Sequence, residues 1–148
     1  MALSAAAGPL SNFFLAIVSF GLLTVIYHVA PDFLYDQTSN TLTYNSRFIQ
    51  IMIFLNILLG AFNLIPIPPL DGSRILRHFL PNEGKRFIDR MERFGIFILL
   101  AVILLPGYFG LPSILWTFLT PFFWLYEKAF MHTFDLNFYI LFLNSYFT

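Results

Sequence analysis

The chain has 148 residues, of which 58% are hydrophobic and 11% are charged, and its mean hydropathy is +0.75. Soluble domains are about 45–50% apolar and about 25% charged, so this composition excludes a disordered chain and most soluble enzymes and indicates a membrane protein. Eight basic residues balance eight acidic ones, which excludes a nucleic-acid-binding module. Cysteine is absent, so disulfides, thiolate nucleophiles and cysteine-ligated metals are excluded as well.

The first thirty residues contain no Asp, Glu, Lys or Arg. Residues 10–30 are apolar and long enough to cross a hydrocarbon core of about 30 Å as a helix, which takes about 20 residues. A cleavable signal peptide is the alternative, but the basic start and the short apolar core of a signal peptide are both missing. The polar segment that follows, residues 31–47, is expected to be an exposed loop.

A second span is predicted over residues 48–65. Three prolines lie in and around its end, within Ile65–Leu70. Proline removes a backbone donor and biases the residue before it towards an extended conformation. We therefore expect the helix to end near Leu64 or Ile65 and the segment Ile65–Leu70 to be extended.

A basic stretch follows, with six of the eight basic residues between Asp71 and Arg93. By the positive-inside rule, the loop 74–93 faces the cytoplasm. Nucleic-acid binding is the alternative for such a run, but three acidic residues are interleaved with the basic ones, which favours a topology signal. A short amphipathic helix is expected directly after Asp71.

The remaining apolar residues predict two further spans, over residues 94–107 and 113–127, separated by a turn rich in proline and glycine. The expected fold is all-α: a polytopic membrane helix bundle of about four apolar helices, with a second span broken by proline. Residues 1–128 form this transmembrane domain. Residues 129–148 are an apolar, aromatic tail without an assigned role, and the last stretch of this tail is suited to the membrane interface.

Asp71 directly follows the proline segment and is the most informative residue of the chain. An acidic residue at membrane depth costs about 2.5–3.5 kcal/mol on insertion scales, so such a residue is a candidate for function. A zinc ion would offset this cost, because carboxylate oxygen is a good zinc ligand. The structural alternative is that Asp71 caps the next helix, since Asp is a preferred N-cap residue. From the residues alone, the two interpretations have equal weight.

Two motifs resemble a known family. Residues 63–74, NLIPIPPLDGSR, resemble the Asn-x-x-Pro-x-Pro-Pro-Leu-Asp-Gly-x-Arg signature of the site-2 protease family, the intramembrane zinc metallopeptidases. Residues 7–12, AGPLSN, are similar to the Ala-Gly-Pro-x-x-Asn motif of the same family. The resemblance implies cleavage of transmembrane protein substrates in the lipid bilayer by water activated on Zn²⁺, with Asp71 as one metal ligand. It also implies a set of residues that line the cavity or contact substrate: Gly8, Pro9, Asn12, Asn63, Pro66, Pro68, Pro69 and Gly72.

The chain departs from the family at one point, because it contains no His-Glu-x-x-His. In the family, this motif supplies two zinc ligands and the glutamate that acts as general base. The histidines of this chain, His28, His78 and His132, have no neighbouring glutamate, and we interpret them as surface or interfacial residues. No catalytic residue is therefore assigned in this chain, and by itself the chain is expected to bind zinc weakly and to show no proteolysis.

Two explanations of this departure stay open. We favour a chain that is the C-terminal portion of a bacterial enzyme of the cytoplasmic membrane, since Asp71 and its prolines are intact. A short protein that has lost catalysis is the alternative, and such a protein would act as a membrane scaffold or chaperone of the same fold. A small transporter ranks third, because transporters with broken helices have paired repeats and only one broken segment occurs here.

For Asn63, hydrogen bonding between helices, as for Asn56, is the structural alternative.

Overall fold

The computed structural model describes residues 2–36, 39 and 41–144, and within them seven α-helices dominate the fold. The helices are α1 (Ala2–Val29), α2 (Tyr44–Asn63), α3 (Asp71–Phe79), α4 (Asn82–Glu92), α5 (Gly95–Tyr108), α6 (Ile114–Thr133) and α7 (Leu136–Asn144). A 3-10 helix, η1 (Pro31–Phe33), and an antiparallel hairpin of β1 (Tyr35–Asp36) and β2 (Thr41–Leu42) connect α1 to α2. The prediction of an all-α membrane fold is confirmed.

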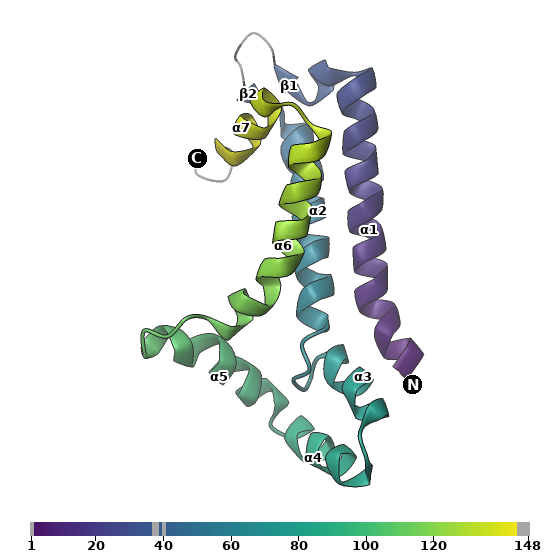
Figure 1. Ribbon diagram of the computed structural model, residues 1–148, viewed down its shortest axis with the longest axis vertical. Helices are drawn as coiled ribbons and strands as arrows, with labels where there is room; N and C mark the ends of the chain where they lie inside the picture. The colour runs from purple at the N-terminus through teal and green to yellow at the C-terminus, as the bar shows by residue number, and fades with distance from the viewer. Residues whose placement is uncertain (1, 37–38, 40, 145–148) are drawn as a thin grey trace.

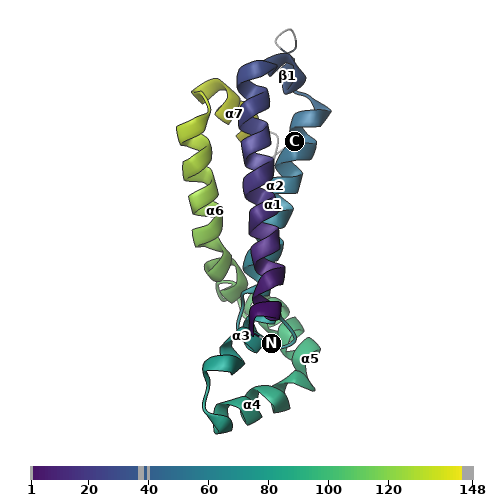
Figure 2. The ribbon, with the colours of Figure 1, turned by 90° about the vertical axis from the view of Figure 1, so that its right-hand side faces the viewer.

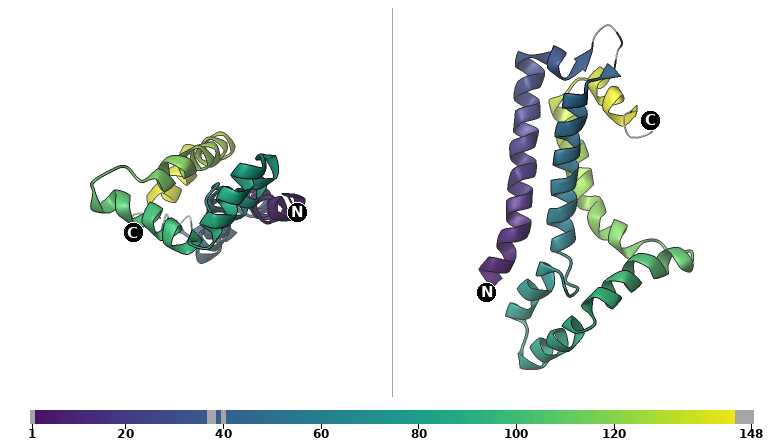
Figure 3. Two further views of the ribbon diagram at one scale, coloured as in Figure 1. Left: turned by 90° about the horizontal axis from the view of Figure 1, so that it is seen from below. Right: turned by 180° about the vertical axis from the view of Figure 1, so that it is seen from behind.

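The helices form an elongated molecule in which α1 and α2 lie side by side along the long axis (Figure 1). Helix α6 leans against the half of this pair that is remote from the N-terminus, where α7 and the hairpin also lie (Figure 2). Helices α3 and α4 lie at the opposite end, near the N-terminus of α1. Helix α5 runs away from α1 and α2 and meets α6 at the tip of a V, which is seen most clearly from behind (Figure 3).

Two helices of the described residues are long and apolar enough to cross a membrane: Leu3–Val29 within α1, and α2. Helices α4 and α5 pass the same test only as a pair, which is bent by 79° at the break between them. The described residues therefore hold two candidate spans, or three if the bent pair is one span, as expected of an integral membrane protein. The fourth predicted span falls in α6, and the residues at which each helix enters the bilayer stay a prediction.

The segment between α1 and α2 is more ordered than the exposed loop that its polar sequence predicts. Leu34 is completely buried and Leu42 is 7% exposed, so the hairpin contributes to the apolar core. Helix α2 begins at Tyr44, because Thr43 caps it: its Oγ1 accepts a hydrogen bond from the Ser46 amide at 3.2 Å. The expectation of an exposed loop was wrong for these residues, since hydrophobic side chains that alternate with polar ones in a short hairpin are turned inward.

The aromatic tail folds back on the bundle. Phe130 of α6 is completely buried, and its ring centroid lies 4.4 Å from that of Phe134 and 4.2 Å from that of Phe142 in α7. At the turn between α6 and α7, the Tyr27 hydroxyl donates a hydrogen bond to Asp135 Oδ2 at 2.6 Å. The tail, for which the sequence suggests no role, therefore fastens α6 to the end of α1. Its last residues, 145–148, lie outside the described part of the chain.

The aromatic cluster leads to a stability prediction. Replacing Phe130→Ala removes a completely buried ring and is expected to lower the free energy of unfolding by about 3–5 kcal/mol. Thermal unfolding of the purified chain in detergent, followed by circular dichroism, measures this loss. The control is Phe109→Ala, since Phe109 is 65% exposed and its truncation leaves no cavity. Equal effects of the two substitutions would contradict the packing described here.

Candidate functional site

The proline segment at the end of α2 forms a chain of turns, so the expectation of an extended segment over Ile65–Leu70 was wrong. Helix α2 ends at Asn63, as predicted to within two residues, and the Pro68–Pro69 peptide bond is cis. Proline blocks a helix, but its fixed φ is compatible with tight turns, and the turns satisfy backbone groups that an extended strand without a partner leaves open. Three backbone hydrogen bonds close the segment: Ile65 N to Phe62 O at 3.1 Å, Ile67 N to Ile65 O at 2.8 Å, and Leu70 N to Ile67 O at 3.0 Å.

Two glycines hold this segment between α3 and α5. A Cβ atom on Gly72 would lie 2.2 Å from the backbone oxygen of Leu64, so only glycine allows the first turn of α3 to touch the end of α2. A Cβ atom on Gly95, the first residue of α5, would lie 2.9 Å from the carbonyl carbon of Pro68. Gly72 belongs to a motif of the sequence and was predicted to be part of the site, whereas Gly95 was not. Gly95 contacts the prolines only in the folded chain, since it is far from them in the sequence.

Asp71 is the first residue of α3, and this helix lies beside the N-terminal part of α1. The Oδ2 atom of Asp71 is 3.0 Å from the position that a Cβ atom on Gly8 would occupy. The two motifs therefore meet in space, and the missing side chain of Gly8 makes room for the carboxylate. The side chain of Asp71 is 30% exposed, while the neighbouring Pro9 is completely buried.

The structure does not support the interpretation of Asp71 as a helix cap. The N-cap position of α3 is occupied by Leu70, whose carbonyl oxygen accepts hydrogen bonds from the amide and the hydroxyl of Ser73, at 3.1 and 2.7 Å. Asp71 instead forms an ion pair with Arg74, in which Oδ1 and Nη1 are 3.8 Å apart. One carboxylate oxygen thus faces Arg74 and the other faces Gly8.

The described residues do not by themselves make a zinc site. Within residues 2–36, 39 and 41–144, no group of three or more His, Cys, Asp or Glu is placed to hold a metal ion. Asp71 offers a carboxylate of the right chemistry, but no histidine joins it. His28 contacts its own helix, with Nδ1 at 2.8 Å from the Thr24 carbonyl oxygen, and the His78 ring packs edge-on against Phe79.

The other residues of the predicted site have mixed surroundings. Pro68 and Gly72 are buried, Pro66 and Pro69 are exposed, and Asn12 and Asn63 are half-buried. Asn56, for which hydrogen bonding between helices is also the alternative, donates to Met52 O within its own helix at 2.8 Å. The structure therefore brings Gly8, Asp71 and Gly72 together, and the roles of these residues towards metal or substrate stay predictions.

Ion pairs join α3 to α4 beside Asp71. Arg77 donates two hydrogen bonds to Asp89, from Nε to Oδ1 at 2.6 Å and from Nη2 to Oδ2 at 2.9 Å. Arg74 Nη2 lies 3.7 Å from Glu92 Oε1. The two arginines are three residues apart, and so are the two acids. This matched spacing could have predicted the ion pairs from the sequence. These charges border a pocket of about 510 Å³ that is lined by Ser4, Ala5, Asp71, Arg74, Arg77, Asp89 and Glu92.

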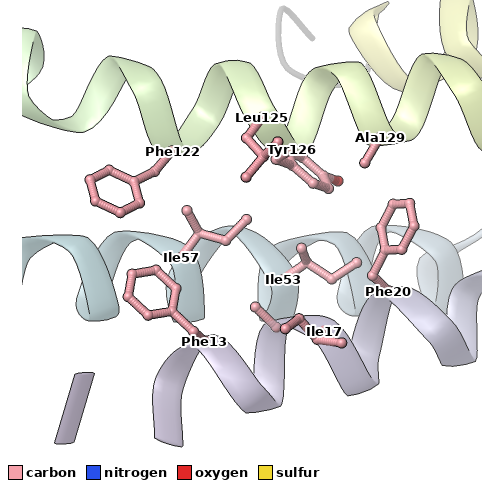
Figure 4. A pocket seen from close by; sticks show the side chains of 10 residues that line it. Phe13, Ile17, Phe20, Ile53, Ile57, Phe122, Leu125, Tyr126 and Ala129 are labelled. Atoms are coloured by element: carbon pink, nitrogen blue, oxygen red, sulfur yellow. The ribbon is translucent and has the colours of Figure 1, made fainter. Parts of the chain in front are cut away.

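An apolar groove of about 460 Å³ runs between α1, α2 and α6 (Figure 4). It begins near Phe13, little more than one helical turn beyond Gly8, and continues towards the remote end of α1. Aromatic and aliphatic side chains from all three helices line it, and no Asp, Glu, His, Lys or Arg is among them. The lining residues are Phe13, Ala16, Ile17, Phe20, Ile53, Ile57, Phe122, Leu125, Tyr126 and Ala129.

The ion pair between α3 and α4 predicts a dependence on pH. The hydrogen bonds from Arg77 lower the pKa of Asp89 below its usual value of 3.8. Because the pKa of Asp89 is lower in the folded protein than in the unfolded one, its carboxylate stabilises the folded state when the pH is above the unfolded pKa. This stabilisation is lost as the pH falls through the folded pKa. Spin labels on α3 and α4 are therefore expected to move apart below about pH 4. In Asp89→Asn the distance should not change with pH over this range, and an equal change in both proteins would contradict the assignment.

The close approach at Gly72 predicts that any side chain there disturbs the proline turns. Gly72→Ala places a methyl group against backbone atoms that cannot yield, so we expect a lower melting temperature in detergent and displacement of α3 from α1. The matched control is Gly21→Ala, because nothing lies within 4 Å of the Cβ position at Gly21. That substitution, inside α1, is expected to raise stability by about 0.5–1 kcal/mol. A Gly72→Ala protein as stable as the control would refute the contact.

Comparisons with known proteins agree with these motifs. The sequence model of peptidase family M50 matches residues 1–106. YwhC of Bacillus subtilis is 33% identical over 100 residues, which cover 68% of this chain and 44% of YwhC. The regulator of sigma-W protease RasP of the same bacterium is 39% identical over 77 residues, which cover 51% of this chain and 18% of RasP. The zinc metalloprotease MJ0392 of Methanocaldococcus jannaschii is 33% identical over 120 residues, which cover 70% of this chain and 32% of that protein.

Each of these alignments spans less than half of the relative. No solved structure matches the chain. The family match nevertheless covers more than two thirds of the chain, and it includes α1 to α4, most of α5, both motifs and Asp71. The chain therefore belongs to peptidase family M50, the site-2 protease family.

Proposed function

We propose that this chain is part of an intramembrane zinc metalloprotease that cleaves transmembrane protein substrates, and that Asp71 is one of its zinc ligands. The observation that carries the proposal is the position of the Asp71 carboxylate against Gly8, which joins the two motifs at one end of the spanning helices. Membership of peptidase family M50 supports it, as do relatives named zinc metalloproteases. The Bacillus relatives support a bacterial cytoplasmic membrane, and the positive-inside rule supports a position of α3 and α4 on its cytoplasmic side.

The two oxygens of Asp71 differ in their surroundings. Oδ1 is turned towards Arg74 at 3.8 Å, whereas Oδ2 is turned towards the backbone of Gly8. We assign Oδ2 as the ligand atom, since the absence of a side chain at Gly8 leaves it accessible. The ion pair with Arg74 orients the carboxylate.

The metal would supply an activated water and polarise the scissile carbonyl when it is bound. Because the described residues provide Asp71 without histidine partners, the other donors and the general base come from outside this chain. The part of this chain is to position one ligand and to shape the approach to it. The proline turns, on which Gly72 and Gly95 pack, hold Asp71 at the end of α2. A substrate helix that unwinds can reach Asp71 there.

The apolar groove supports a transmembrane substrate. Its walls are hydrocarbon and aromatic rings from three helices, so it suits the side chains of a helix taken from lipid (Figure 4). Such a helix gains little from the hydrophobic effect when it leaves lipid, so close packing against the groove has to hold it. The groove starts near Phe13, on the same helix as Gly8, which aligns a bound segment with Asp71.

A graft into a related protease tests the proposal. The stretch of Bacillus subtilis RasP that aligns with this chain is replaced by the aligned part of this chain, and cleavage of a transmembrane substrate is measured in membranes. We expect the chimera to cleave, and Asp71→Ala in the chimera to lower the rate by at least about a hundredfold, as loss of a metal ligand removes metal-dependent chemistry. Zinc content of the purified chimera, measured in parallel, should fall with the same substitution.

The control substitution is Asp32→Ala, which removes a carboxylate at the opposite end of α1 and should leave cleavage and zinc content unchanged. A chimera whose cleavage and zinc content are both indifferent to Asp71→Ala would overturn the ligand assignment. A chimera that holds transmembrane substrates without cleaving them, with the rest of the RasP machinery intact, would favour a scaffold that grips helices.

A further inference from the structure

The fold separates the charges of α4 onto two faces. Asp89 and Glu92 are turned towards α3, where they pair with Arg77 and Arg74. Arg86, Arg90 and Arg93 follow one another at intervals of four and three residues, so they share a different face of the helix. Glu83, three residues before Arg86, also lies on this side of the helix, so the second face carries three basic groups and one acidic group.

No carboxylate of the described residues pairs with the arginines of this basic face. All three arginines are exposed. The polar contact recorded for their side chains is internal, from Arg90 Nε to the Arg86 carbonyl oxygen at 3.3 Å. Three guanidinium groups thus present their donors outward, in the geometry that binds phosphate.

Two phenylalanines adjoin the basic face. Phe87 of α4 is 56% exposed, and Phe94, at the turn between α4 and α5, is 62% exposed. Exposed aromatic rings beside arginines are typical of helices that lie in a membrane interface. A partner that is only charged would leave these rings in water.

The position of α4 fits such an interface. It lies at the end of the molecule where α1 begins and α2 ends, and it runs across the direction of these two helices (Figures 1 and 2). The bend of 79° between α4 and α5 keeps it from continuing as part of an apolar helix. A bilayer crossed by α1 and α2 therefore has one surface at the level of α4.

We propose that α4 docks on anionic phospholipid head groups of the bilayer that α1 and α2 cross. Arg86, Arg90 and Arg93 bind the lipid phosphates, and Phe87 and Phe94 enter the interface. The combination of arginines, aromatic rings and adjacent spans favours lipid over a polynucleotide. Since the ion pairs tie α4 to α3, docking also fixes the depth of Asp71 relative to the lipid phosphates.

The experiment uses the full chain in lipid nanodiscs. The chain has no cysteine, so Asn82→Cys, an exposed and uncharged position four residues before Arg86, carries a single nitroxide label. Accessibility to oxygen and to a water-soluble nickel complex is compared between discs of phosphatidylcholine and discs with an equal share of phosphatidylglycerol. We expect the anionic lipid to shield the label from nickel and expose it to oxygen. Each basic residue near an anionic surface contributes about fivefold, so Arg86→Gln with Arg90→Gln should lower the docked-to-undocked ratio about 25-fold.

The matched control is Arg47→Gln with Lys128→Gln, which removes the same number of charges elsewhere and should keep the response to anionic lipid. Equal accessibility in the two kinds of disc would overturn the proposal, as would a lipid response that survives loss of Arg86 and Arg90. Protection of the label by a single-stranded RNA in phosphatidylcholine discs, without any response to phosphatidylglycerol, would identify a nucleic acid as the partner instead. The readout does not depend on zinc or proteolysis, so its failure leaves the proposed protease function untouched.

Discussion

The contact between Gly72 and the backbone at the end of α2 is the constraint on which the candidate site depends. Within a bilayer, irregular backbone survives only where its polar groups are satisfied and protein surrounds it. The proline turns meet the first condition with their own hydrogen bonds, and α3 and α5 meet the second by packing on them through glycines. This packing sets the direction of α3 and so carries Asp71 to Gly8.

The two ends of the molecule use different interactions. At the remote end, stacked rings of α6 and α7 and the hydrogen bond from Tyr27 to Asp135 make a dense aromatic cluster that stabilises the bundle. At the end that bears Asp71, ion pairs between α3 and α4 and a pocket lie beside the glycine contacts. Exposed ion pairs stabilise little, so the glycine contacts and not the ion pairs hold the position of Asp71. Such a division suits the proposed role, in which this end admits a substrate segment and a metal.

Much of the organisation is predictable from the residues, because composition and uncharged runs depend on local chemistry alone. The membrane class, the all-α fold, the end of α2 at the prolines and the helix after Asp71 follow from these features, whereas the family follows from the resemblance of two motifs. The turns within Ile65–Leu70 and the burial of Leu34 did not follow. Proline predicts where a helix ends, but it does not determine the conformation of the residues that follow. A hairpin becomes part of a core only when helices from elsewhere in the chain cover it.

Asp71 shows what the sequence determines about a residue and what only the tertiary structure determines. The residues by themselves determined that a costly carboxylate follows a broken span, and they weighed a metal ligand equally against a helix cap. The tertiary structure decided against the cap, because Leu70 holds that position and the carboxylate lies between Arg74 and Gly8. It also paired two acidic residues of α4 with arginines of α3 and left three arginines of α4 without an ion pair. Both outcomes depend on contacts between segments far apart in the chain, and the energies of such contacts exist only once the helices have packed.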